Sequence, residues 1–363
     1  MIENVFFELL RIAIGNDGYL SHTPTTDEWR ELYAMAKKQS LVGVCFVGLQ
    51  WLQSQHQCPP EKLYLQWMGM AAKIQQRNEV MNHAVVEAYQ KLKEAGFKSC
   101  VMKGQSLLRF YPESLRSLRQ CGDIDVLVDK TDVEVLSYAW PIMGEVFDWS
   151  YKHVHLDLQL ESYIDLHYRC AMSRNLLRNA RIQAWCKELK RGGFEYHDSL
   201  GYATLRNEDN VVFLLLHLLW HFLFEGIGMR QVVDYYFVLH TMYDRSNVTE
   251  RLEEFGLKKF ASGLMWVLQY VFVLDRLFMI CEPNEKEGRF LLSEILKAGN
   301  FGHYDERNKV SRDDNEVCRV WKRLFHYTRL LKHYPTEFLW IPVSYFYIRV
   351  WRAVTWKKVK SAR

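Results

Sequence analysis

Two aspartates, Asp123 and Asp125, lie two residues apart in the otherwise apolar stretch Asp-Ile-Asp-Val-Leu-Val. Because side chains alternate between the two faces of a strand, both carboxylates are predicted to share one face, while Ile124 and Val126 enter a core. Neighbouring carboxylates raise each other's pKa unless a cation lies between them. Mg²⁺ prefers oxygen ligands and often binds one or two carboxylates together with substrate phosphates. The pattern therefore predicts a divalent-metal site that faces a phosphate-bearing ligand.

The residues just before this pair have the types that bind phosphate. A short apolar strand is followed by Lys103-Gly104-Gln105-Ser106, and Arg119 comes four residues before the first aspartate. Gly104 would let the backbone approach a phosphate, and Lys103 and Arg119 would neutralise its charge. The alternatives are carboxylates that cap a turn, a glycine that serves only its positive φ, and a solvated lysine. We favour a binding site, because unpaired carboxylates in an apolar strand are costly.

Together these residues resemble the signature of the polymerase beta-like nucleotidyltransferase superfamily, which has a Gly-Ser or Gly-Gly turn, a helix, and Asp-x-Asp on the next strand. The fuller string of Lys-Gly, Tyr-Pro, Leu-Arg and Asp-Ile-Asp-Val-Leu-Val is similar to a bacterial family of uncharacterised nucleotidyltransferases. That family usually has an arginine at the position of Arg119. Gln105 departs from the Gly or Ser of the superfamily, and Ser106 would then supply the hydroxyl.

The resemblance also implies a third carboxylate on a neighbouring strand. In the run Tyr-Ile-Asp-Leu-His-Tyr, Asp165 and His167 share one face, and the family has an acid-x-His pattern there. We assign the third carboxylate to Asp165, with Asp157 and Glu161 as rivals. His167 would contact phosphate or transfer a proton, or it would be a histidine at the core edge. Two other histidines that alternate along a strand are interpreted as structural: His153 and His155.

The activity that the resemblance implies is transfer of a nucleoside monophosphate from an NTP, with ATP expected, to an unidentified hydroxyl acceptor. Asp123 and Asp125 would bridge two Mg²⁺ ions about 3.5–4 Å apart, and Asp165 would hold the second ion and help deprotonate the acceptor. The alternative is a catalytically inactive protein that keeps the pocket for binding or assembly. The expected nucleotide contacts are Lys103, Gly104, Gln105, Ser106, Arg119 and His167.

Two further pairs of polar residues lie one helical turn apart in the second half of the chain. His217 and His221 lie on a very apolar helix without the glutamate of a metalloprotease motif, so we favour core or cleft histidines. Arg230 and Asp234 follow on the next helix. We favour a structural salt bridge between them, with a contact to nucleotide or acceptor as the alternative.

The composition is that of an ordinary folded protein. The chain has 363 residues, of which 49% are hydrophobic and 25% charged, and its net charge of +4 gives no strong nucleic-acid signal. Eight scattered cysteines without a Cys-x-x-Cys pair indicate buried thiols of a reducing compartment. The first residues carry acids and no basic region, unlike a signal peptide, so we expect a cytoplasmic protein.

We expect an α+β fold in which a small mixed sheet of the nucleotidyltransferase type is flanked by helices. The predicted division is an N-terminal helical region over residues 1–96, an α/β core over 97–175 and a C-terminal helical region over 176–363. The tail, 338–363, mixes aromatic and basic residues, and its apolar run is too short to cross a bilayer. We favour packing of this tail on the body, with a weak membrane-surface contact as the alternative.

Overall fold

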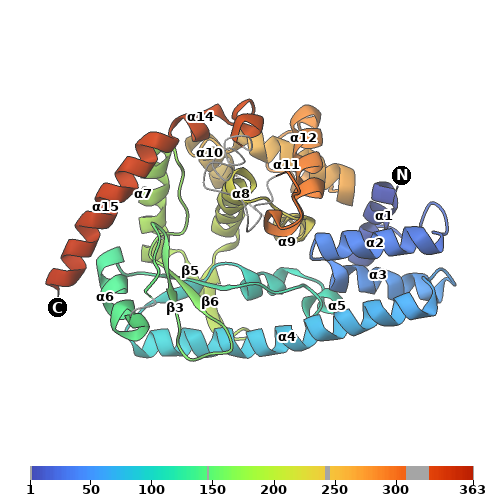
Figure 1. The fold of residues 1–363 in the computed structure, drawn as a ribbon, viewed down its shortest axis with the longest axis horizontal. Helices are drawn as coiled ribbons and strands as arrows, with labels where there is room; N and C mark the ends of the chain where they lie inside the picture. Colours follow the sequence, from blue (N-terminus) through green and yellow to red (C-terminus); the bar gives the residue numbers. More distant parts are fainter. Residues whose placement is uncertain (1, 145–146, 242–245, 308–326, 363) are drawn as a thin grey trace.

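The computed structural model describes residues 2–144, 147–241, 246–307 and 327–362, and it shows a mixed β-sheet surrounded by helices (Figure 1). The expected α+β class is confirmed. The strands are β1 (Ser99–Val101), β2 (Ile124–Val128), β3 (His153–Leu156), β4 (Ile164–His167), β5 (Phe194–His197) and β6 (Tyr202–Leu205).

Helices precede, interrupt and follow the sheet. The 3₁₀ turns are η1 (Gly104–Phe110), η3 (Arg276–Phe278) and η4 (Asn300–Gly302). The α-helices are α1 (Ile2–Ile14), α2 (Thr26–Lys38), α3 (Val42–Ser54), α4 (Glu61–Glu94), α5 (Glu113–Arg116), α6 (Asp132–Met143), α7 (Leu176–Gly192), α8 (Asn207–Phe224), α9 (Met229–Leu239), α10 (Ser246–Glu254), α11 (Lys258–Phe272), α12 (Glu285–Ala298), α14 (Pro335–Leu339) and α15 (Ile341–Ser361).

The sheet has the strand order β3-β4-β2-β1-β6-β5. The β2–β4 and β1–β6 pairs are parallel, and the remaining neighbours are antiparallel. β5 and β6 come from residues beyond 175, so the sheet also uses chain outside the range 97–175; the three-part division itself stays a prediction. Before β3, Trp149 and Val154 form an isolated antiparallel bridge, and residues 145–146 lie outside the described residues.

Side-chain alternation gives the β3-β4-β2 half of the sheet one apolar and one polar face. The apolar face, which includes Val126, Val154 and Leu166, packs on α4 and α6 in one core. The opposite face of the same three strands carries imidazole and carboxylate side chains. His217 on α8 lines one pocket with Lys103 and Asp123, which places α8 over this polar face. The polar side chains of the sheet therefore lie between its strands and helix α8.

The long helix α4 forms the base on which the sheet and its loops lie (Figure 1). Its buried Asn78 donates hydrogen bonds to the carbonyl oxygens of Ser117 (2.8 Å) and Arg119 (2.7 Å). These bonds satisfy carbonyls in a loop without secondary structure. α4 therefore fixes the segment that leads into β2.

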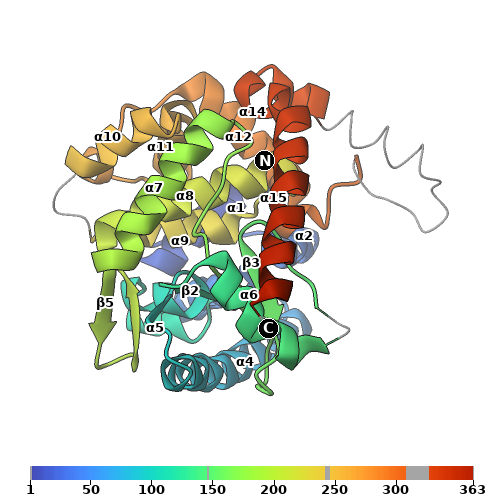
Figure 2. The ribbon, with the colours of Figure 1, turned by 90° about the vertical axis from the view of Figure 1, so that its left-hand side faces the viewer.

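One face of α15 packs along α6 near the C-terminus (Figure 2). The Trp356 ring lies 4.6 Å from that of Trp140, the Trp351 ring lies 5.4 Å from that of Trp149, and Val359 is fully buried. The tail thus packs on the body, as favoured from the sequence. Within the described residues, every helix is too short or too polar to span a membrane.

Candidate active site on the polar face of the sheet

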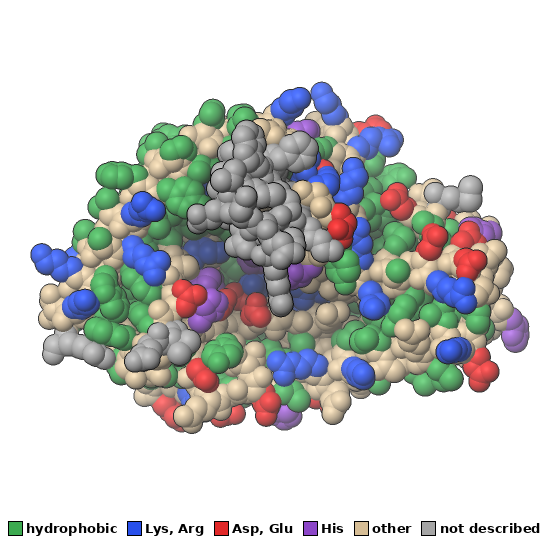
Figure 3. All heavy atoms as spheres, viewed as in Figure 1, with side chains coloured by type: hydrophobic (Ala, Val, Ile, Leu, Met, Phe, Trp, Pro, Cys, Tyr) green, Lys and Arg blue, Asp and Glu red, His purple; other side chains and the backbone are tan. Residues whose placement is uncertain are grey.

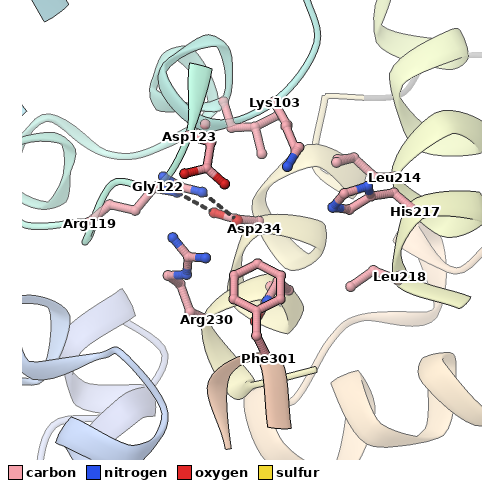
Figure 4. A pocket seen from close by; sticks show the side chains of 13 residues that line it. Lys103, Arg119, Gly122, Asp123, Leu214, His217, Leu218, Arg230, Asp234 and Phe301 are labelled. Carbon is pink, nitrogen blue, oxygen red and sulfur yellow. Dashed lines mark hydrogen bonds and ion pairs between the residues drawn. The ribbon is translucent and has the colours of Figure 1, made fainter. Parts of the chain in front are cut away.

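Two parallel strands bring two predicted carboxylates side by side. In the β2–β4 pairing, Asp125 is opposite Asp165, and Leu127 is opposite His167. Both aspartates and His167 therefore lie on the polar face. The prediction that Asp123 shares this strand is not met, because β2 begins at Ile124. Asp123 is exposed just before the strand and points into an adjacent pocket (Figure 4).

Asp125 is buried between two nitrogen groups. Lys103 Nζ lies 2.8 Å from its Oδ2 atom, and His167 Nε2 lies 3.0 Å from its Oδ1 atom. Burial acts to raise the pKa of Asp125, but Lys103 and His167 more than offset it and hold this pKa below its usual value. Asp125 is therefore ionised at neutral pH, with a neighbour at each oxygen.

Asp165 lies among the histidines that the sequence interpretation treated as structural. The antiparallel β3–β4 pairing sets His155 opposite Asp165 and His153 opposite His167. His155 Nδ1 lies 2.6 Å from Asp165 Oδ1, while His153 Nε2 lies 3.9 Å from Oδ2. Burial and the charge of Asp125 raise the pKa of Asp165. Burial, with His167 next, lowers the pKa of His153 to about 2, so His153 is neutral.

A pocket adjoins this cluster, between the turn after β1, the start of β2 and helices α8 and α9 (Figure 4). Gly104 at its wall has a φ of +68°, and a Cβ there would lie 3.2 Å from the carbonyl oxygen of Asp123. The turn therefore favours glycine on both conformational and steric grounds. Six of the predicted site residues line the pocket: Lys103, Gly104, Arg119, Asp123, Arg230 and Asp234.

One wall of the pocket is a buried polar network. Arg119 binds Asp234 through Nε (2.5 Å) and Nη2 (2.7 Å), and the Tyr111 hydroxyl donates to Asp234 Oδ1 at 2.6 Å. The expected salt bridge between Arg230 and Asp234 is wrong. Helical spacing places those two residues on one face, but a tertiary partner takes the carboxylate, and Arg230 instead donates to the carbonyl oxygen of Gln120 at 2.7 Å.

Arg230 is a buried cation at the other wall of the pocket. Only 6% of its surface is exposed, and no carboxylate of the described residues lies within ion-pair distance of it. Burial and the charge of Arg119 lower its pKa to about 10, so it stays protonated at neutral pH. Its Nε atom and the Nη1 atom of Arg119 are buried without hydrogen-bond partners among the described groups. The pocket therefore suits an anion.

Two predicted nucleotide contacts, Gln105 and Ser106, do not line the pocket. Gln105 is buried and donates to the side-chain oxygen of Asn82 on α4. Ser106 is fully buried, and its hydroxyl has no hydrogen-bond partner within the described part of the chain. The structure does not bring either side chain to the pocket wall.

Several residues that the sequence interpretation did not assign to the site contribute to it. His217 on α8 lines the pocket, and Phe301 lies over Arg230, with its ring centre 5.8 Å from the guanidinium carbon. The spacing of His217 and His221 is a signal in the sequence, whereas Phe301 belongs to no sequence motif. His153 and His155 required the β3 register. At the surface, histidine and acidic side chains gather at a hollow near the middle of the molecule (Figure 3).

The comparisons with known proteins agree with this arrangement. A family model described as "Uncharacterised nucleotidyltransferase" matches residues 25–273, which is more than half of the chain and includes all six strands. No curated protein and no solved structure matches. The chain therefore belongs to this family of uncharacterised nucleotidyltransferases.

Proposed function

We propose that this nucleotidyltransferase moves a nucleoside monophosphate from an NTP to a hydroxyl-bearing acceptor on the polar face of the sheet. The observation that supports this most is the alignment of Asp125 with Asp165 on parallel strands, beside the glycine turn at Gly104. The cationic pocket next to them fits the polyphosphate. ATP is the expected nucleotide, and the cytoplasm, where NTPs are available, is the expected compartment.

The donor set fits a divalent cation. Asp125 and Asp165 offer oxygen ligands on adjacent strands. Burial, and after it the charge of Asp125, raise the pKa of Asp165, and a bound cation would offset both effects. These two residues would hold the ion, with Asp123 reaching toward a second one from the pocket side. Mg²⁺ is the ion expected from the sequence. When bound, such an ion would neutralise charge on the reacting phosphate.

The chain's own groups have distinct proposed roles. Lys103 contacts Asp125 and also lines the pocket, so it can exchange its carboxylate for a phosphate oxygen. Arg119 is oriented by Asp234 and keeps Nη1 for a phosphate. Arg230 would bind the same polyphosphate or the acceptor. Asp165, whose pKa is raised, would accept the proton of the acceptor hydroxyl.

A second candidate function is nucleotide binding without catalysis. Two observations favour it: both oxygens of Asp125 already have partners, and Gln105 stands where the superfamily has a small residue. A metal ion would have to displace Lys103 or His167 from Asp125. If that exchange does not occur, the pocket would bind a nucleotide as a sensor or assembly signal.

A transfer assay distinguishes the two candidates. The full chain is incubated with each of the four NTPs labelled at the α-phosphate, with Mg²⁺ or Mn²⁺, and with fractionated small molecules, proteins and nucleic acids from cells. Label should enter one fraction with the wild type and not with Asp165→Asn. Nucleotide binding without transfer would support the second candidate, and the absence of both would contradict both.

We also propose that the outer face of α15 contacts an anionic lipid surface. Its side facing away from α6 exposes Val343, Val350, Val354 and Phe346, the last with 71% of its surface accessible. All charged residues after Glu337 are basic. An apolar stripe beside basic residues suits an anionic headgroup layer.

Vesicle co-sedimentation tests this contact with the full chain. Vesicles that contain phosphatidylglycerol should bind the wild type, and Phe346→Glu should lower the bound fraction severalfold. Leu177→Glu, at an equally exposed leucine on α7, is the matched control. Equal sedimentation of all three proteins would contradict the proposed contact of α15 with lipid.

A further inference from the structure

We propose that His153, Asp165 and His167 form a binding site for a first-row transition-metal ion rather than for Mg²⁺. One ligand atom from each residue lies within 4.8 Å of the other two. The site shares Asp165 with the proposed function, but it requires neither a nucleotide nor the transfer reaction. It lies where β3 and β4 pair, on the polar face of the sheet.

The orientation of His167 points to a ligand at its Nε2 atom. Its Nδ1 lies 3.2 Å from the carbonyl oxygen of Arg169, which can only accept a hydrogen bond, so Nδ1 carries the proton. Nε2 lies 3.0 Å from Asp125 Oδ1, at the polar face of the sheet. Metal-binding histidines commonly donate their other N–H to a carbonyl in this way, which leaves Nε2 to face the ion.

His153 and Asp165 present two more free acceptor positions. His155 occupies Asp165 Oδ1 at 2.6 Å and thereby orients the carboxylate, while Oδ2 lies 3.9 Å from His153 Nε2. That distance is too long for a hydrogen bond. The Nδ1 atom of His153 is buried without a hydrogen-bond partner among the described residues, so no described group fixes which ring nitrogen carries the proton. Oδ2 and Nε2 are at a separation that one cation bound to both would span.

The geometry needs only small side-chain movements. Metal–ligand bonds of about 2.0–2.2 Å place neighbouring ligand atoms roughly 3–3.5 Å apart. Strand pairing already fixes His153 opposite His167, with their ring centres 4.7 Å apart. Rotation of side chains, without backbone change, can close the remaining gap.

The ligand types decide which ion is preferred. Imidazole nitrogens suit zinc, iron, cobalt and nickel, whereas Mg²⁺ favours oxygen ligands in a nearly octahedral arrangement and retains its waters. Two imidazoles and one carboxylate therefore select a transition ion. The oxygen-rich position between Asp125 and Asp165 remains the better site for Mg²⁺.

Co²⁺ is a suitable probe, because its visible absorption reports nitrogen ligands and coordination number. Titration of the metal-free full chain, without nucleotide, should give a saturable visible band that one equivalent of Zn²⁺ removes and millimolar Mg²⁺ does not. His153→Gln should weaken Co²⁺ binding at least tenfold, as should His167→Gln. His83→Gln, at an exposed histidine on α4, is the control and should bind like the wild type.

A second measurement needs no variant. Pulsed electron paramagnetic resonance of the wild type with substoichiometric Cu²⁺, an ion that imidazole ligands suit, should detect directly bound imidazole nitrogen. Oxygen-only coordination, or equal Co²⁺ affinity in wild type and His153→Gln, would overturn the inference. Transfer activity of His153→Gln with Mg²⁺ alone would support the proposed function independently of this metal site. Co²⁺ binding by a wild-type protein that shows no transfer would support this metal site independently of the proposed function.

Discussion

Asp125 and Asp234 are both buried carboxylates with nitrogen neighbours, yet their surroundings differ in kind. Asp234 accepts two hydrogen bonds from Arg119 and one from Tyr111, and all three side chains are enclosed. Asp125 contacts one lysine and one histidine, and the Lys103 side chain is 19% exposed.

This difference indicates which of the two carboxylates can take part in the reaction. A bidentate arginine holds its partner in one geometry, whereas a lysine is a point charge on a flexible stem that can change partners. Asp125 also lies beside Asp165, so two negative charges compete for the same cations. We therefore interpret the Arg119–Asp234–Tyr111 network as a structural wall and the Asp125 cluster as the reactive part.

The largest expected effect is on stability at the structural wall. Asp234→Ala leaves Arg119 buried without its carboxylate and should cost about 3–5 kcal/mol of unfolding free energy. Asp125→Ala should cost less, about 1–3 kcal/mol, because Lys103 can reach water. Urea denaturation of both variants measures the comparison, and equal losses would contradict the distinction.

Acid should reduce the stability contributed by the wall. Burial opposes ionisation of Asp234, but Arg119 outweighs it and lowers the folded-state pKa below the unfolded value of about 3.9. A depressed pKa gives stability that is present above the unfolded pKa and is lost as pH falls through the folded one. The difference in unfolding free energy between wild type and Asp234→Asn should therefore be largest at pH 5 and should decrease below about pH 4. A difference that stays constant down to pH 2.5 in urea titrations would contradict this.

Substitution of Arg230 should affect nucleotide affinity more than it affects stability. Arg230→Met removes a buried cation that has no carboxylate within ion-pair distance among the described residues, and it breaks one hydrogen bond to the Gln120 carbonyl oxygen. The two effects oppose each other, so the free energy of unfolding should change by only about 1 kcal/mol or less. Affinity for a non-hydrolysable NTP should fall roughly tenfold, the size of one charged hydrogen bond. Arg206→Gln, at an exposed arginine, serves as control in both calorimetry and denaturation. A large loss of stability in Arg230→Met would instead make this residue part of the wall.

The smallest expected effect comes from one hydroxyl. Tyr111→Phe removes a single donor from Asp234 while Arg119 stays bound, so it should cost about 1 kcal/mol. Nucleotide affinity should not change, because the Tyr111 side chain does not line the pocket. Thermal denaturation and calorimetry of this variant measure the two quantities. A loss of affinity would show that Asp234 alone does not position Arg119 for the ligand and that the Tyr111 hydroxyl is needed as well.

Features that depend on local pattern could be predicted from the sequence. Alternation along the chain identified β2 and β4, and with the family resemblance it identified Asp125, Asp165 and His167 as residues of one face. The ends of the long helix α4 agree with local signals, because two prolines precede it and Gly96 follows it.

Features that depend on tertiary pairing could not be predicted in the same way. Arg119 and Asp234 are 115 positions apart, so nothing in the spacing of α9 revealed that Asp234 binds Arg119 instead of Arg230. The β3 register, which brings His153 and His155 to Asp165, is a property of strand pairing. Asp123 fell outside β2 because the pairing with β4 begins only at Ile124.

Calorimetric titration with a non-hydrolysable ATP analogue, with and without divalent metal, tests the central claim most directly. The account predicts metal-dependent binding in the wild type that disappears in Asp125→Asn and persists in Tyr111→Phe. Binding that is unchanged in Asp125→Asn, or no binding by the wild type with any NTP analogue, would contradict the placement of nucleotide and metal on the polar face of the sheet.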